Sequence, residues 1–147
     1  MSEPVEILLV EDYEPDAQLV SILLKRNRIA NKVHLVRDGG EALDFLFCRG
    51  AYHRRSFEHP PGVVLLDIRL PKLDGWEVLH RLRQDPRTSR IPVVIMSGSI
   101  YAEDMEKGKQ LGALGCLSKP VPFEKLRELL TESGFVWLLL GQQLQEN

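Results

Sequence analysis

The chain has little cysteine, no long hydrophobic run and no strong excess of charge of one sign. Its two cysteines, Cys48 and Cys116, form no metal-type cluster and add little covalent stabilisation, so free thiols in a reducing cytosol are expected. The longest apolar stretch, Phe135–Leu140, is far too short to cross a bilayer. With 19 basic and 21 acidic residues the formal net charge is -2, which favours neither nucleic acid nor a membrane as partner.

Several functional motifs are also missing. The segment Met1–Pro4 has no basic stretch followed by an apolar run, so no secretory signal peptide is expected. The turn after Val5–Val10 is acidic and lacks glycine, which disfavours a nucleotide- or flavin-binding loop. No spacing typical of metal ligands relates the histidines, which are His34, His53, His59 and His80. The composition, 44% hydrophobic and 27% charged, indicates one globular domain.

Apolar runs of strand length alternate with stretches of helical spacing. The runs predict five strands, at Val5–Val10, Lys32–Arg37, Val63–Leu66, Val93–Met96 and Leu114–Ser118. Between them apolar residues recur at helical spacing, as in Ala17, Val20 and Leu24. This series of βα units indicates an α/β fold, a doubly wound parallel sheet with helices on both faces.

Three segments are interpreted as turns or loops. Asp38–Gly40 and Asp74-Gly75 have the composition of tight turns, so the helix after the first is expected to begin at Glu41. Gly50–Gly62 is longer than most connections, and such a loop is either functional or merely mobile. The sequence favours the mobile loop.

Charged and polar residues stand where the predicted strands end. They are Glu11 and Asp12 after the first strand, Asp67 after the third, Ser97 after the fourth and Lys119 after the fifth. Because the carboxyl ends of parallel strands share the edge at which sites form, these side chains are expected to converge. The set fits an aspartate that accepts a phosphoryl group.

The predicted acidic cluster needs a cation. Neighbouring carboxylates repel one another unless they protonate, separate or share a positive ion. Glu11, Asp12 and Asp67 offer the oxygen ligands that Mg²⁺ prefers. Asp67 is the predicted nucleophile, which forms an aspartyl phosphate, while Lys119 supplies charge and Ser97 a hydroxyl to the phosphoryl oxygens.

Each of these residues also has a plain structural interpretation. Glu11 and Asp12 could place negative charge at a helix N-terminus, worth under ~1 kcal/mol each. Ser97 could cap the next helix, and Lys119 could be a surface lysine before a turn. Their joint placement at four strand ends favours the site.

In this order the motifs resemble the receiver domain of two-component response regulators. The resemblance covers roughly residues 5–133 and is carried by Glu11-Asp12, Asp67–Gly75, Ser97 and Lys119-Pro120. It implies a flavodoxin-like strand order 2-1-3-4-5, with 1–133 as the receiver domain. It also implies that Asp67 takes phosphate from the phosphohistidine of a sensor histidine kinase, in the cytoplasm, as a signal and not as an enzyme with external substrates.

The resemblance assigns further roles. The Mg²⁺ ligands would be Asp12, Asp67 and the backbone carbonyl of Arg69, with Glu11 acting mainly through water. The peptide bond before Pro120 would be cis, as in the family. One position departs from the family pattern, because Cys116 stands where receivers usually carry tyrosine or phenylalanine.

The C-terminal segment bears on how the signal is passed to a partner. Only Gly134–Asn147 follows the last predicted helix, too little for a DNA-binding domain, so the expected output of this stand-alone receiver is another protein. Six consecutive apolar residues, Phe135–Leu140, favour burial against a second copy over folding back on the domain. Receivers associated with bacterial phytochromes look similar. The extension 134–147 is therefore predicted to be a dimerisation arm, and a phytochrome-type kinase the phosphodonor.

Two other functions stay open. A phosphatase of the haloacid-dehalogenase type also uses an aspartate after a strand, but it carries a second aspartate two residues on, where this chain has Arg69. A receiver-like interaction module that works without phosphate typically loses the acceptor or the lysine. Both residues, Asp67 and Lys119, are present here.

Overall fold

The computed structural model describes residues 6–141, in which strands and helices alternate as the sequence predicts. The strands are β1 (Glu6–Val10), β2 (Lys32–Val36), β3 (Val63–Asp67), β4 (Val93–Ser97) and β5 (Gly115–Ser118). The helices are α1 (Glu14–Arg26), α2 (Gly39–Leu46), α3 (Gly75–Gln84), α4 (Ala102–Gln110) and α5 (Phe123–Glu132), with a 3-10 turn η1 (Gly50–Tyr52). Val5, which was predicted to begin the first strand, lies outside the described residues.

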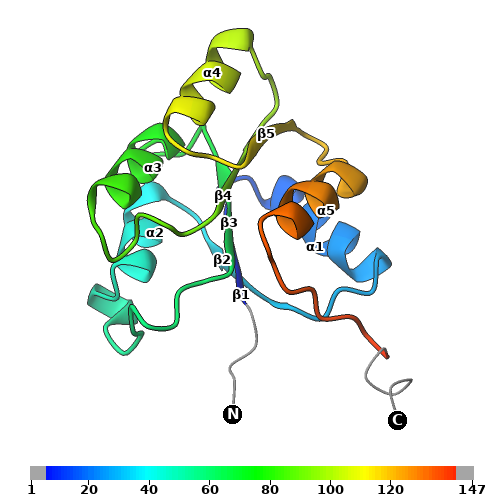
Figure 1. Ribbon diagram of the computed structural model, residues 1–147, viewed down its shortest axis with the longest axis horizontal. Helices are drawn as coiled ribbons and strands as arrows, with labels where there is room; N and C mark the ends of the chain where they lie inside the picture. Colours follow the sequence, from blue (N-terminus) through cyan, green and yellow to red (C-terminus); the bar gives the residue numbers. More distant parts are fainter. Residues whose placement is uncertain (1–5, 142–147) are drawn as a thin grey trace.

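The strands form one parallel sheet in the order β2-β1-β3-β4-β5 (Figure 1). Every residue of β3 and β4 is buried, in agreement with the unbroken apolar runs Val63–Leu66 and Val93–Met96 that precede the terminal Asp67 and Ser97. The register aligns the carboxyl ends, since Val10 lies beside Leu66 and Asp67 beside Met96. This order confirms the flavodoxin-like fold, and it reverses between β1 and β3, where such sheets form their sites.

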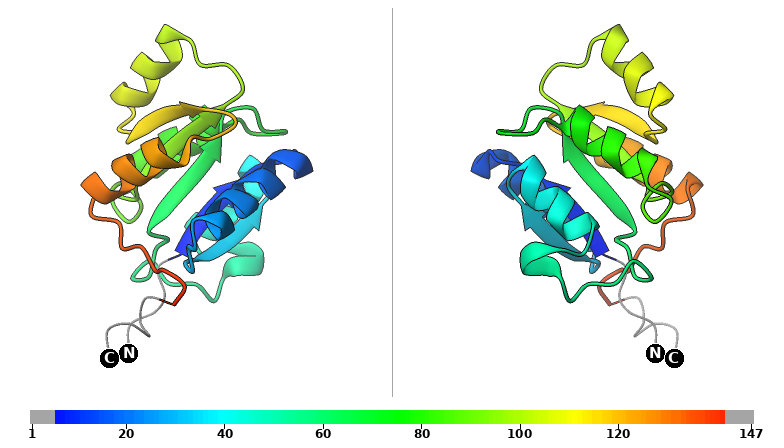
Figure 2. Two further views of the ribbon diagram at one scale, coloured as in Figure 1. Left: turned by 90° about the vertical axis from the view of Figure 1, so that its right-hand side faces the viewer. Right: turned by 90° about the vertical axis from the view of Figure 1, so that its left-hand side faces the viewer.

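Helices cover both faces of the sheet. Figure 2 shows α1 and α5 on one face and α2 and α3 on the other, with α4 beside β5. Leu24 and Leu126 lie in the core under the first pair, and Phe45 and Leu79 in the core under the second. Each such buried side chain contributes about 2 kcal/mol. Between residues 6 and 141, no helix has both the length and the apolar composition needed to cross a membrane.

The two predicted turns are helix N-termini. The Asp38 carboxylate caps α2 by accepting a 2.7 Å hydrogen bond from the amide of Glu41. The Asp74 carboxylate caps α3 in the same way, 3.0 Å from the amide of Glu77. Such a cap satisfies a free amide of the first turn and stabilises the helix by about 1 kcal/mol. The interpretation of both segments as plain turns is therefore wrong, and α2 begins at Gly39.

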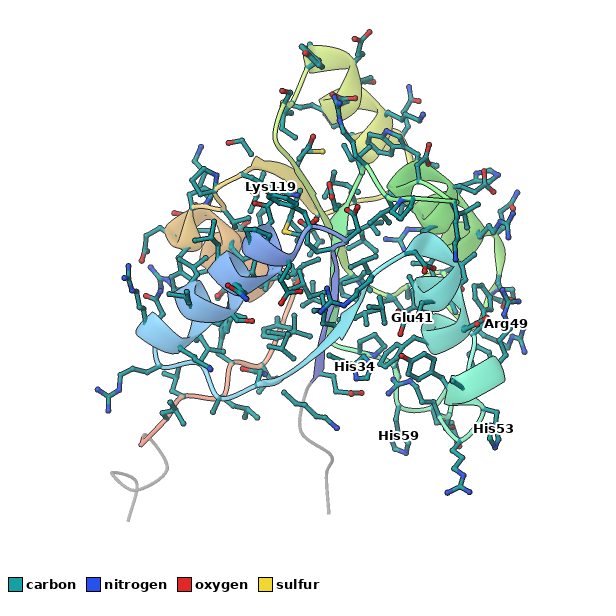
Figure 3. The ribbon with its side chains drawn as sticks, turned by 180° about the vertical axis from the view of Figure 1, so that it is seen from behind. His34, Glu41, Arg49, His53, His59 and Lys119 are labelled. Carbon is teal, nitrogen blue, oxygen red and sulfur yellow. The ribbon has the colours of Figure 1, made fainter. Side chains whose placement is uncertain are left out.

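The long connection 50–62 is packed against the rest of the protein. Tyr52 of η1 donates a 2.6 Å hydrogen bond to Glu41 of α2, which Figure 3 labels. The guanidinium of Arg55 lies 3.7 Å from the centre of the Phe45 ring. These contacts anchor the loop against α2, and the Tyr52 hydroxyl also lies 3.3 Å from the ring of His34 in β2. The packing does not agree with the prediction of a merely mobile loop.

The apolar segment after α5 folds back on the same chain. The amide of Ala30 donates to the carbonyl of Leu138 at 2.6 Å, and the amide of Leu140 donates to the carbonyl of Arg28 at 2.7 Å. These bonds join the segment to the connection between α1 and β2. It therefore continues the fold beyond the last helix.

The side chains of this segment divide between core and solvent. Phe135 and Trp137 pack against the core under α1 and α5, with 4.8 Å between their ring centres. Val136 and Leu140 are 56% and 52% exposed. Apolar surface therefore remains on the outer side of the segment. The rest of the predicted arm, 142–147, lies outside the described residues.

Candidate functional site

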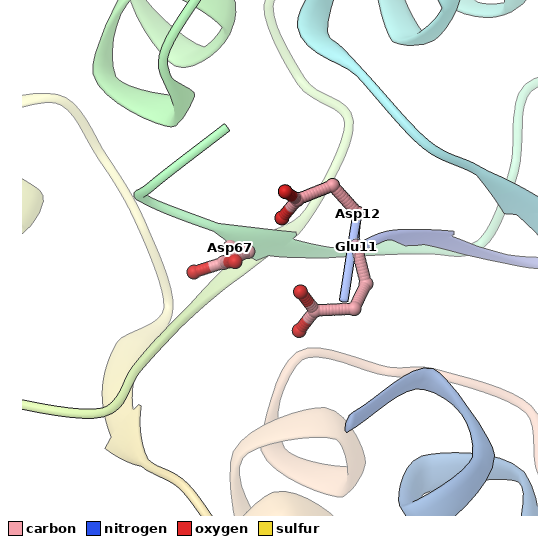
Figure 4. Close-up of side chains that lie close together, drawn as sticks. All are labelled: Glu11, Asp12 and Asp67. Carbon is pink, nitrogen blue, oxygen red and sulfur yellow. The ribbon is translucent and has the colours of Figure 1, made fainter. Parts of the chain in front are cut away.

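The three carboxylates predicted to converge lie together at the carboxyl edge of the sheet (Figure 4). One oxygen each from Glu11, Asp12 and Asp67 lies within 4.8 Å of the other two. Asp67, the last residue of β3, is 4% exposed, and Glu11, directly after β1, is 0% exposed, whereas Asp12 is open to solvent. Oxygen ligands gathered in this way fit a hard divalent cation.

Lys119 brings the compensating positive charge into this cluster. Its Nζ lies 2.5 Å from Glu11, 3.0 Å from Asp16 and 3.2 Å from Asp67. The amide of Lys119 donates a 2.8 Å hydrogen bond to the carbonyl of Ser97, which ties the end of β5 to the end of β4. The peptide bond that follows this lysine is cis, as predicted.

Burial and ion pairing shift the pKa values of Glu11 and Lys119 in opposite directions. Burial raises the pKa of the Glu11 carboxyl above its ordinary value, and the hydrogen bond from Lys119 opposes the rise. Burial alone would lower the pKa of Lys119, but the hydrogen bonds to Glu11 and Asp16 outweigh it and raise that pKa, so the ammonium stays charged. A single ammonium leaves the cluster with a surplus of negative charge, which a divalent cation would balance.

The backbone around Asp67 is tightly packed. Its Oδ1 accepts a 3.3 Å hydrogen bond from the amide of Arg69. A β carbon on Gly75 would come within 2.4 Å of the Asp67 carbonyl oxygen, so α3 begins in direct contact with the end of β3. The Arg69 residue is exposed, and the metal-binding role of its carbonyl stays a prediction.

Ser97 lies at the predicted strand end but bonds to its own loop. The residue is 1% exposed, and its hydroxyl donates to the carbonyl of Ser99 at 3.0 Å and accepts from the Ser99 amide at 3.3 Å. In the sheet, Ser97 of β4 lies opposite Ser118 of β5, and the preceding residue of β4, Met96, lies opposite Asp67 of β3. Donation to a phosphoryl oxygen therefore requires the hydroxyl to leave Ser99, and it stays a prediction.

Asp16 is the site residue that sequence reasoning missed. It lies in the first turn of α1, with its carboxylate 3.0 Å from Lys119. From sequence alone it is an ordinary first-turn acid that complements the helix dipole. Its position four residues after Asp12 is a weak signal, and the lysine is 103 residues further along the chain.

Cys116 leaves room for α4 to approach the sheet closely. A β carbon on Gly108 of α4 would lie 2.9 Å from the Cys116 sulfur and 3.9 Å from the ring of Trp76. The sulfur also lies 3.8 Å from the carbonyl of Asp104. A helix therefore packs directly on the small side chain that replaces the expected aromatic residue.

A parallel sheet of this order, with a buried aspartate at the end of β3 and a paired lysine at the end of β5, defines a phosphoacceptor domain of the receiver type. The family model described as the response regulator receiver domain matches residues 7–131. The chain therefore belongs to the response regulator receiver domain family.

Three relatives are similar over most of their length. Response regulator Rcp1 of Synechocystis sp. (strain ATCC 27184 / PCC 6803 / Kazusa) is 36% identical over 135 residues, which span 92% of this chain and 90% of Rcp1. The structure of the bacteriophytochrome response regulator AtBRR has a TM-score of 0.84 at 39% identity, covering 96% of this chain and 100% of that one. The phosphorylated cyanobacterial phytochrome response regulator RcpA has a TM-score of 0.73 at 35% identity, with coverages of 88% and 91%.

A metal-bound relative bears on the acidic cluster. The Mn²⁺-bound form of Rcp1 has a TM-score of 0.72 at 36% identity, covering 88% of this chain and 91% of that one. The cluster of Glu11, Asp12 and Asp67 fits the divalent metal binding that this relative displays.

Proposed function

We propose that this chain is a stand-alone response regulator in which Asp67 accepts a phosphoryl group from a sensor histidine kinase. The observation that carries the proposal is the buried Asp67 carboxylate, 3.2 Å from Lys119 and grouped with two further carboxylates. In the transfer, an Asp67 oxygen bonds to phosphorus while the P–N bond of phosphohistidine breaks, and the imidazole leaves with the electron pair. Lys119 offsets the negative charge on the phosphoryl oxygens.

Mg²⁺ is the proposed cation. Asp12, Asp67 and the carbonyl of Arg69 would hold it directly, and Glu11 would act through water. Bound there, the ion supplies positive charge that offsets the repulsion between the carboxylates and an incoming phosphoryl group. The all-oxygen donor set and the surplus of negative charge support a hard cation at this place.

Ser97 would connect phosphorylation to the surface around α4. Its hydroxyl would leave the carbonyl of Ser99 for a phosphoryl oxygen, which moves the loop before α4. Gly108 is the only buried residue of α4, and Met105 is 56% exposed. A helix with so few buried contacts can move at a small cost in free energy. The surface 101–125 is the proposed output face. Identical amide exchange there with and without phosphorylation would contradict this.

A phytochrome-type histidine kinase is the proposed phosphodonor. Its support is the similarity to AtBRR and RcpA, which are themselves described as phytochrome response regulators. Transfer would take place in the cytoplasm, which the two free cysteines also favour. Transfer from a phytochrome kinase to wild type and not to Asp67→Asn is the expected result, and a kinase of another class that transfers faster would exclude the phytochrome.

The extension 134–147 is the proposed dimerisation arm. Val136 and Leu140 leave apolar surface exposed. An exchange of arms between two copies would place the backbone bonds to Arg28 and Ala30 between the copies. Deletion of 135–147 should reduce the molar mass in solution to that of a monomer. An unchanged mass would remove the arm from the proposal.

Intact-protein mass spectrometry tests the central proposal. Wild type incubated with acetyl phosphate and Mg²⁺ should gain one phosphoryl group, and Asp67→Asn should gain none. Asp44→Asn is the matched control, since Asp44 is a half-exposed aspartate that pairs with Arg49 outside the site. If wild type takes up no phosphoryl group and binds no beryllofluoride, the chain is a receiver-like module that works without phosphate.

A further inference from the structure

A third carboxylate, from a helix, contacts the lysine of the site. Asp16 of α1 lies 3.0 Å from Nζ of Lys119, nearer than Asp67 at 3.2 Å, while Glu11 lies at 2.5 Å. Asp16 does not belong to the cluster of potential metal ligands. An ammonium has three N–H donors, and three carboxylates surround them.

The ammonium donates hydrogen bonds to Glu11 and Asp16, whereas it faces Asp67 as an ion pair at 3.2 Å. Phosphoryl oxygens on Asp67 would draw the ammonium toward them and lengthen one of these two hydrogen bonds. Glu11 has a side chain 1% exposed, and a buried carboxylate without its cation is strongly destabilising. The Asp16 side chain is 28% exposed, so water can replace the lysine there at lower cost.

We propose that Asp16 is a positioning residue, which holds Lys119 in the unphosphorylated protein and yields it to the phosphoryl group. The inference rests on the proposed function of Asp67. The Asp16 carboxylate opposes phosphorylation because it competes for the ammonium and because its charge repels the phosphoryl anion. Asp16 thus sets the balance between the two states without touching the reacting atoms.

The test measures anion binding and cation binding separately, on the full chain. Asp16→Asn keeps the side-chain shape and removes the charge, whereas Asp16→Glu keeps the charge. Glu14→Gln is the matched control, because Glu14 lies in the same helical turn but pairs with Arg37 at the surface. Each protein is titrated calorimetrically with Mg²⁺ alone and then, in saturating Mg²⁺, with beryllofluoride, an unreactive analogue of the phosphoryl group.

Asp16→Asn is expected to bind beryllofluoride about fivefold more tightly than wild type, the value of a partly exposed ion pair. Its Mg²⁺ affinity should stay the same or fall, since a nearby negative charge is gone. If Asp16 only stabilised α1, Asp16→Asn would instead bind both beryllofluoride and Mg²⁺ more weakly than wild type. Asp16→Glu and Glu14→Gln should stay close to wild type in both titrations.

Unchanged or weaker binding of beryllofluoride to Asp16→Asn, with wild-type binding intact, overturns the inference and leaves the proposed function standing. A wild type that binds no beryllofluoride and accepts no phosphoryl group overturns the proposed function, and the inference falls with it. The two failures are therefore distinguishable.

Discussion

The first residue of α3 lies against the backbone of the proposed phosphoacceptor. A β carbon on Gly75 would come within 2.4 Å of the carbonyl oxygen of Asp67 and 2.9 Å of the Cα of Ile68. The amide of Gly75 also donates a 2.8 Å hydrogen bond to the carbonyl of Ile68. The start of α3 therefore determines where the end of β3, and with it the Asp67 carboxylate, can lie.

Gly75→Ala should move the Asp67 carboxylate and destabilise the fold. The added methyl group meets backbone that cannot give way locally, at a cost of about 2 kcal/mol. Phosphorylation by acetyl phosphate should slow as well. Gly98→Ala is the control, because a β carbon there meets nothing within 4 Å although the residue follows Ser97. Denaturant unfolding and intact mass check both, and equal effects of the two changes would contradict the argument.

Lys119→Met should destabilise the metal-free protein by about 3 kcal/mol, because it leaves buried Glu11 without a cation. Added Mg²⁺ should recover more stability in the variant than it adds to wild type, since the ion replaces the missing charge. Lys125→Met, an exposed lysine of α5, provides the comparison. Unfolding curves with and without Mg²⁺ give the result. A Mg²⁺ response equal to that of wild type would contradict the expectation.

The edge strand β2 carries a histidine whose protonation opposes folding. The ring of His34 lies 4.7 Å from that of Phe45 and beside the Tyr52 hydroxyl, and Figure 3 labels it. Burial lowers the pKa of His34 below 6.5, with Glu6 opposing the shift and Arg55 reinforcing it. The folded protein therefore binds this proton less tightly than the unfolded chain.

It follows that the free energy of unfolding should decrease as the pH falls below 6.5. His34→Gln should make this decrease shallower, whereas His80→Gln, at an exposed position, should leave the wild-type profile intact. Denaturant unfolding between about pH 5 and 7 measures the slopes. Identical slopes for all three proteins would exclude a contribution from His34.

Arg83 joins α3 to the end of α4. Its guanidinium donates hydrogen bonds to the carbonyls of Leu111 at 3.0 Å, Gly112 at 3.1 Å and Ile91 at 2.9 Å. Arg83→Met should cost about 2 kcal/mol because several carbonyls lose a charged donor. Arg81→Met removes only a surface pair within α3 and should cost under about 0.5 kcal/mol. Equal losses of stability would show that Arg83 is not an anchor.

Much of the site could be predicted because its residues lie at, or directly after, the carboxyl ends of the parallel strands. Unbroken apolar runs identify β3 and β4, and the next charged or hydroxyl residue must then stand at the shared carboxyl edge. Glu11, Asp12 and Asp67 come together for this reason alone. Lys119 follows the same rule, although its three carboxylate contacts do not follow from its position in the sequence.

Other features depend on contacts that local patterns do not contain. Asp16 meets its lysine only because the fold brings the first turn of α1 next to the residue that follows β5, and an acidic first turn predicts no partner. Asp38 and Asp74 show that local sequence can also be ambiguous. Helix N-caps and tight turns have the same amino-acid composition, and only the backbone geometry distinguishes one from the other. The segment after α5 is apolar in either case, whether it covers its own chain or a second copy.

Helix α1 connects two regions that lie at its opposite ends. Its first turn holds the ion pair of Asp16 and Lys119, and the residues just beyond its last turn, Arg28 and Ala30, hold the segment after α5. Its 13 residues form a stiff rod about 20 Å long. Any tilt of the rod on release of Lys119 would shift the place where the arm attaches. Helix α1 is therefore a direct structural connection between the proposed phosphorylation site and the proposed arm, on a path that does not pass through α4.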